Sequence, residues 1–131
     1  MCGSSARKEV AVLLIGEFAD RTGLSQRTVR HYDEIKVLQA SGRSECGYRF
    51  YAPADLDRAR VIRAMRALSL STTEIRDDLA TLDRVESATS APTPADRREL
   101  AAILADAERR EYALREQIGV ASDFVEMLRA L

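Results

Sequence analysis

Apolar residues first recur at helical spacing at Ile15, Phe18, Ala19 and Thr22, which predicts a short amphipathic helix. Gly23 ends that helix, and Ser25 is placed to cap a second one from Gln26 to about Ile35. Two helices joined by so tight a turn indicate a helix-turn-helix.

The second helix has two chemically different faces. Its inward face carries Thr28, Val29, Tyr32 and Ile35, and its outward face carries Arg27, Arg30, His31 and Glu34. The outward face is basic toward its N-terminal end, which is typical of a helix that reads base edges and phosphates.

A short hairpin and a third helix are predicted next. Residues 41–51 read S-G-R-S-E-C-G-Y-R-F-Y, with turn glycines and an aromatic, β-prone end, so we expect a wing. Pro53 suits the first position of the third helix. The apolar face of this helix consists of Leu56, Ala59, Ile62, Met65 and Leu68, and Arg60, Arg63 and Arg66 form a basic row.

The remaining boundaries follow from capping signals. Ser71 and Glu74 form a capping box that opens a fourth helix through about Leu82. Residues 83–92 are rich in Ser, Thr, Ala and Pro and predict a linker, whereas residues 1–12 lack periodicity and predict a disordered tail. The DNA-binding domain is therefore expected over residues 13–82.

Residues 93–131 predict one long helix with a heptad seam. The seam consists of Leu100, Leu104, Ala107, Leu114, Ile118, Ala121, Val125 and Leu128. A helix of ~48 Å beside a domain of ~70 residues cannot bury this stripe alone, so we expect a second copy as its partner. Gly119 leaves open whether the helix is broken.

Charge and composition support a DNA-facing front half. The net charge is −1, yet residues 1–70 hold 12 basic and 8 acidic side chains, and residues 71–131 hold 8 and 13. Cys2 and Cys46 are too few for a disulfide framework or a metal cluster, which favours a reducing cytoplasm. No apolar run is long enough for a membrane span, so we expect a cytoplasmic protein without membrane contact.

The order of these motifs resembles the MerR family of bacterial transcription regulators. The matching strings are I-G-E-F-A-D-R-T-G-L-S-Q-R-T-V-R-H-Y-D-E-I, G-R-S-E-C-G-Y-R-F-Y, A-P-A-D-L and L-S-L-S-T-T-E-I. The resemblance implies a mainly α fold: a winged helix-turn-helix of four helices with a β-hairpin wing, followed by a dimerisation helix that forms an antiparallel coiled coil. It also implies a homodimer that binds a pseudo-palindromic promoter operator in double-stranded DNA and bends and untwists it beside RNA polymerase.

Site residues carried over by position lie on the second helix, the wing and the third helix. The resemblance implies DNA contacts by Arg27, Arg30, His31, Tyr32, Arg43, Tyr48, Arg49, Tyr51, Arg60 and Arg63. The alternatives are that Tyr32, Tyr48 and Tyr51 are core aromatics and that the Arg60 row is a solvated face. Two positions depart from the family pattern: Lys36 stands where Gly is usual, and His31 replaces a Tyr.

No effector site is evident in the sequence. Residues 71–131 contain no Cys and no His, so a thiolate metal site is not expected there, and we expect no cofactor. Cys46 is either a redox residue or an ordinary loop thiol. An enzyme is not expected, because no phosphate loop, metal motif or nucleophile pair is present. The alternative function is an effector-less DNA-binding regulator controlled by a partner protein that docks on the C-terminal helix.

Overall fold

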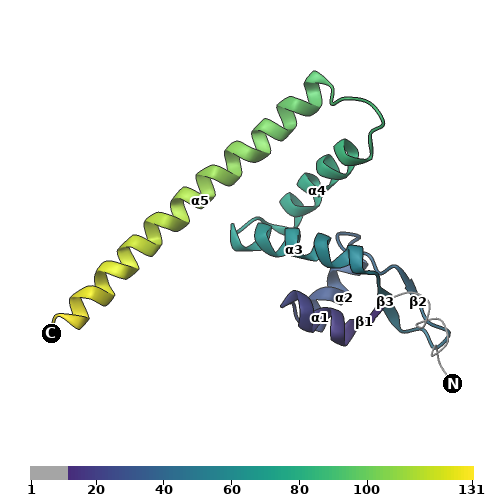
Figure 1. The fold of residues 1–131 in the computed structure, drawn as a ribbon, viewed down its shortest axis with the longest axis horizontal. Helices are drawn as coiled ribbons and strands as arrows, with labels where there is room; N and C mark the ends of the chain where they lie inside the picture. Colours follow the sequence, from purple (N-terminus) through teal and green to yellow (C-terminus); the bar gives the residue numbers. More distant parts are fainter. Residues whose placement is uncertain (1–11) are drawn as a thin grey trace. The chain divides into compact units, whose positions relative to one another are not determined.

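The computed structural model describes residues 12–131, which divide into two compact units. The first unit ends at Arg66 and the second is Ala67–Leu131. The tail expected over residues 1–12 lies, up to residue 11, outside the described residues. Each unit is described by itself below, with the element labels of Figure 1.

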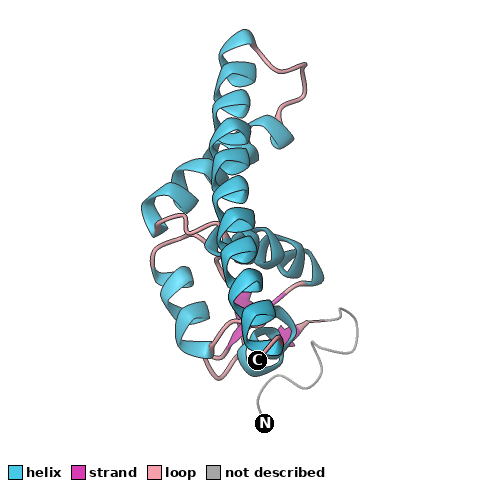
Figure 2. Ribbon diagram, turned by 90° about the vertical axis from the view of Figure 1, so that its left-hand side faces the viewer, coloured by secondary structure: helices cyan, strands magenta, loops and turns pink. Residues whose placement is uncertain are grey.

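The first unit combines three helices with a small sheet. Its elements are β1 (Leu13–Leu14), α1 (Ile15–Thr22), α2 (Gln26–Glu34), β2 (Gly42–Arg43), β3 (Arg49–Tyr51) and α3 (Pro53–Ala67). The strands are antiparallel in the order β1-β3-β2, with Leu13 opposite Tyr51 and Gly42 opposite Phe50. Figure 2 shows how short these strands are beside the helices. The sequence predicted the β2–β3 wing but missed β1, because two residues carry no periodicity.

The predicted helix-turn-helix is confirmed in its capping details. Gly23 has a left-handed φ of 74°, and its amide donates to the carbonyl oxygen of Ala19 over 3.0 Å. The Ser25 hydroxyl caps α2 by accepting a hydrogen bond from the Thr28 amide over 3.0 Å. Thr22, the last residue of α1, is buried, and its hydroxyl donates to the Ala19 carbonyl oxygen.

The core of the first unit forms around two stacked rings. Phe18 of α1 and Tyr51 of β3 lie with ring centroids 4.1 Å apart and planes 14° from parallel. Val29, Leu38 and Ile62 are completely buried as well. Helices α1, α2 and α3 and strand β3 therefore share one apolar interior, from which the polar faces of α2 and the wing are positioned.

The second unit is an antiparallel pair of helices, α4 (Thr72–Ser87) and α5 (Pro94–Arg129), which run side by side in Figure 1. Both begin with complete capping boxes, Ser71 with Glu74 and Thr93 with Asp96. Helix α4 extends five residues past its expected end at Leu82, because its last turns lie against α5: Arg84 pairs with Glu99 over 2.6 Å. The expected linker is correspondingly shorter.

Helix α5 is uninterrupted over 36 residues, which corresponds to ~54 Å, and Gly119 does not break it. None of its residues is buried in this chain. Among residues 12–131, no helix combines the length and apolar character needed to cross a bilayer.

Candidate nucleic-acid interface

Helix α2 has a buried apolar face and an exposed basic face. Val29 and Tyr32 are buried, whereas Arg27, Arg30 and His31 on the other side are exposed. Within residues 12–131, the contact of the Arg30 side chain is local: its Nη2 donates to Gln26 Oε1 over 3.2 Å. Because this arginine is anchored within its own helix and open to solvent, it can exchange that contact for a base edge or a phosphate.

The wing ends in a turn that exposes Tyr48. The Gly47 amide donates to the Ser44 carbonyl oxygen over 2.8 Å, and Gly47 has a φ of 81°. Arg43 donates to the Gly47 carbonyl oxygen over 3.1 Å, and the Tyr48 side chain is 62% exposed. Of the four expected wing contacts, Arg43 and Tyr48 are thus accessible. Cys46 lies in this turn and is not a free thiol, so its interpretation as an ordinary loop thiol is not supported.

Arg49 is committed to an internal ion pair that joins the wing to α2. Its Nε donates to Asp33 Oδ2 over 2.7 Å, and the two side chains are 18% and 19% exposed. The other oxygen of Asp33 accepts from the Ala40 amide over 3.1 Å. The pair ties α2 to the wing, a role that sequence reasoning missed; the acidic residues Asp33 and Glu34 at the end of an otherwise basic helix were the available signal.

The carboxyl group of Asp33 is held in its ionised form by these contacts. Partial burial by itself would raise its pKa, but the hydrogen bonds from Arg49 and from the Ala40 amide, with the charges of Arg49 and Arg43, outweigh it. The pKa of Asp33 therefore lies below its ordinary value. Asp33 in turn raises the pKa of the Arg49 guanidinium, so both charges persist at neutral pH.

Two of the three expected tyrosine contacts are core residues in the structure. Tyr32 is 5% exposed and Tyr51 is fully buried, which agrees with the core alternative. The Tyr51 hydroxyl has no hydrogen-bond partner among the described residues, and burial raises the pKa of its phenol. Tyr32 and Tyr51 therefore pack in the core under α2 and the wing, whereas Tyr48 lies on the surface.

The basic row of α3 is exposed, and one of its members lies against the helix-turn-helix. Arg60 forms a surface ion pair with Asp57 over 2.8 Å. Arg63 lies over Gly23, where an added Cβ would come within 2.9 Å of its Nη1. Gly23 therefore provides both the left-handed turn and the space that places Arg63 beside it.

The predicted seam on α5 divides into two parts. Leu100, Ala107 and Leu114 are half-buried, and so are Ile103 and Arg110, on the helix face that bonds to α4. Leu104, Ile118, Ala121, Val125 and Leu128 are exposed. Part of the expected intermolecular seam is thus covered by α4 of the same chain, and sequence reasoning missed Ile103.

Residues 13–82 match the family described as "MerR HTH family regulatory protein". The chain is also similar to the mercuric resistance operon regulatory protein of Bacillus cereus, with 36% identity over 73 residues, 56% of this chain and 55% of the relative. A nodulation protein, NolA, of Bradyrhizobium elkanii is 44% identical over 62 residues, 47% of this chain and 28% of the relative. The chain thus spans about half or less of these curated relatives.

Solved structures resemble the chain over most of its length. The HTH-type transcriptional regulator SkgA from Caulobacter crescentus has a TM-score of 0.56 at 26% identity, covering 92% of this chain and 77% of that one. HiNmlR, a MerR family regulator lacking the sensor domain and bound to promoter DNA, has a TM-score of 0.61 at 19% identity, covering 90% and 85%. The second likeness concerns the fold alone.

Proposed function

Because the chain belongs to the MerR family of helix-turn-helix regulatory proteins, we propose that it binds a pseudo-palindromic promoter operator as a homodimer and bends and untwists that operator to control transcription. The observation that carries this proposal is the exposed basic face of α2, with Arg27, Arg30 and His31. Members of this family are regulators and not enzymes.

In this proposal α2 contacts the bases, and the wing and α3 contact the phosphates. Arg30 and Arg27 have the planar fork that suits bidentate contact with guanine or phosphate. Arg43 and Tyr48 on the wing, and Arg60 and Arg63 on α3, add sequence-independent contacts. Tyr32, Arg49 and Tyr51 serve the interface by positioning these elements.

Dimerisation through the exposed half of α5 supplies the second DNA-binding unit. Ile118, Val125 and Leu128 are between 45% and 64% exposed in one chain, on one stripe of the helix. An apolar stripe of this kind is stabilised when a second copy covers it, and an antiparallel pairing places the two DNA-binding units on one duplex.

Two DNA-binding units that are joined in a dimer can bend and untwist the operator. Bending a site of this size costs roughly 1–6 kcal/mol, which the phosphate contacts of both wings must offset. Each base pair of spacer rotates the flanking promoter elements by about 34–36°, so untwisting can bring them into register for RNA polymerase.

Control by a partner protein is the second candidate function. Val120 and Met127 are 71% and 56% exposed and lie outside the predicted seam. A dimer would leave them uncovered, so they favour a further protein surface on α5. A partner captured by the wild-type chain but not by Val120→Asp, with operator affinity unchanged, would support this candidate.

Selection of genomic fragments by the purified full chain, followed by footprinting, tests the proposal. We expect an enriched inverted repeat inside a promoter spacer. Arg30→Ala should weaken binding to that repeat by about 1–3 kcal/mol, because it removes a contact to a base. Arg21→Ala removes an exposed arginine of α1, which pairs with Glu17 of its own helix, and should change affinity little. Recovery of no sequence preference by the wild-type chain would refute the proposal.

A further inference from the structure

Arg110 of α5 uses all three nitrogens of its guanidinium within the second unit. Its Nη1 donates to the carbonyl oxygens of Leu68 and Ser69 over 3.3 and 3.1 Å. Its Nη2 donates to Glu74 Oε2 over 2.6 Å, and its Nε donates to Asp106 Oδ2 over 2.9 Å. The side chain is only 26% exposed. Among the described residues, no other arginine of the second unit bonds to backbone carbonyl groups and to two carboxylates at once.

The two carbonyl groups belong to the turn that connects α3 to α4. The last carbonyls of a helix have no partner within the helix, and here Arg110 supplies donors to those just beyond its end. Ser69 has a left-handed φ of 63°, a conformation that a residue with a side chain holds only at a cost. An external clamp is therefore needed to keep this turn in one shape.

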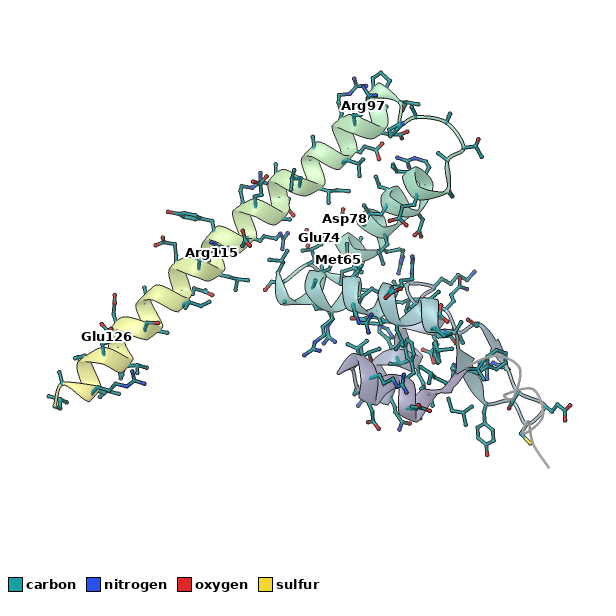
Figure 3. All side chains as sticks on the ribbon, viewed as in Figure 1. Met65, Glu74, Asp78, Arg97, Arg115 and Glu126 are labelled. Carbon is teal, nitrogen blue, oxygen red and sulfur yellow. The ribbon has the colours of Figure 1, made fainter. Side chains whose placement is uncertain are left out.

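Carboxylates surround Arg110, so removal of this positive charge would destabilise the turn that it holds. Partial burial raises the pKa of Asp78, and the charges of Asp106, Glu74 and Asp77 raise it further, while Arg110 opposes them. Figure 3 shows Glu74 and Asp78 on α4, on the side toward α5. Without Arg110, Glu74 and Asp78 would lose the positive charge that opposes their repulsion, and Asp106 would keep its exposed partner Arg109. The remaining repulsion between the carboxylates would loosen the turn and the helix pair together.

We propose that Arg110 is a positioning residue that holds the α3–α4 turn rigid and thereby sets the half-site spacing that the dimer accepts. The turn lies in the second unit, directly after Ala67, and joins α4 to the end of α3, the helix through which the chain enters from the DNA-binding unit. In a dimer joined through α5, a rigid link permits one separation and rotation of half-sites, whereas a loose link permits several. This inference rests on the function proposed above.

Full-length protein and synthetic duplexes test the proposal. The duplexes carry the inverted repeat selected by the wild-type chain, with its native spacer and with a spacer one base pair shorter or longer, which rotates one half-site by about 34–36°. We expect the wild type to prefer the native spacer by about tenfold or more, because the other spacers require extra DNA deformation. Arg110→Ala should reduce this preference to about threefold or less, with unchanged affinity for a duplex that carries one half-site.

Two further variants keep the test decisive. Arg109→Ala removes a neighbouring exposed charge that pairs with Asp106 and should keep the wild-type preference. Arg110→Lys keeps the charge but cannot reach two carbonyls and two carboxylates together, so its preference should be intermediate. A folded, dimeric Arg110→Ala with the wild-type preference overturns the inference. If Arg110→Ala does not fold, Arg110→Lys decides by the same criterion. Wild-type protein that binds no repeat overturns the proposed function instead.

Discussion

Two residues other than glycine, Lys36 and Ser69, adopt left-handed backbone conformations among the described residues, each with a φ of 63°. Lys36 follows the C-terminal end of α2, where its amide donates to the Asp33 carbonyl oxygen over 3.2 Å. The sequence identified Lys36 as a departure from a usual glycine, and the structure confirms that the position requires the left-handed region.

Lys36→Gly should stabilise the protein by about 0.5–1 kcal/mol, because the strain of a side chain at positive φ exceeds the entropy that glycine loses on folding. Urea denaturation at neutral pH measures the effect. Lys36→Ala removes the same charge and keeps the strain, so it should give no such gain. An equal gain for both variants would assign the effect to charge instead.

The partly buried carboxylate of Asp33 connects three segments of the first unit. Its carboxylate joins α2 to β3 through Arg49 and to the following loop through the Ala40 amide. A carboxyl group with a pKa lowered by folding stabilises the native state above its unfolded pKa, and this stabilisation is lost as the pH falls through the lower native value.

Asp33→Asn should therefore cost about 1–2 kcal/mol at pH 7, where the charged hydrogen bond is fully formed. The difference from wild type should shrink as the pH is lowered through and below about 3.9, the ordinary pKa of an aspartate. Denaturation curves across this range provide the measurement. A difference that stays constant with pH would contradict the role of the ionised pair.

At the scale of elements, the wing depends on a close approach between its two strands. Gly42 of β2 lies opposite Phe50 of β3, whose ring covers it: an added Cβ would come within 2.5 Å of the ring carbon Cζ. The glycine is thus required by the ring and not by a special φ. The aromatic ring in turn holds the hairpin that carries Arg43 and Tyr48.

Gly42→Ala should destabilise the wing by about 1–3 kcal/mol, because the ring must move to admit the methyl group. Faster hydrogen exchange at the Ser44 and Tyr48 amides, which are hydrogen-bonded within the wing, would report the change. Gly119→Ala is the matched control: nothing lies within 4 Å of its added Cβ, and alanine favours a helix, so this variant should be neutral or stabilised by up to about 1 kcal/mol. Equal loss in both variants would contradict the packing argument.

At the scale of the whole molecule, the C-terminal part of the seam on α5 stays exposed among the described residues, at Ile118, Val125 and Leu128. Leu114 of the same seam is half-buried within one chain, whereas Ile118 is 64% exposed. A charge at Ile118 therefore tests self-association with little disturbance of the α4–α5 pair.

Ile118→Asp should convert the protein to a monomer and abolish specific operator binding, since a carboxylate in a seam has no partner for its charge. Val120→Asp adds the same charge to a 71% exposed position outside the seam and should remain dimeric. Sedimentation velocity distinguishes the two species. A dimeric Ile118→Asp would show that the seam has been placed wrongly.

Local signals in the sequence determined most of the fold. The Ser25 cap, the boxes of Ser71 and Thr93, and the helix periodicity all act over three or four residues, so they could be recognised without knowledge of distant segments. For the same reason the exposed basic face of α2 was predictable from the spacing of its residues.

Tertiary structure alone decided which of the candidate residues remain accessible and what holds the elements together. Asp33 and Arg49 are 16 residues apart in the chain, and Arg110 is 42 residues from Leu68. Tyr51 is buried because β3 pairs with β1 and its ring stacks on Phe18. The N-terminal part of the seam on α5 is covered because α4 packs antiparallel to it. Such contacts depend on how the chain turns back on itself, and the periodicity of the sequence does not predict which distant segments meet.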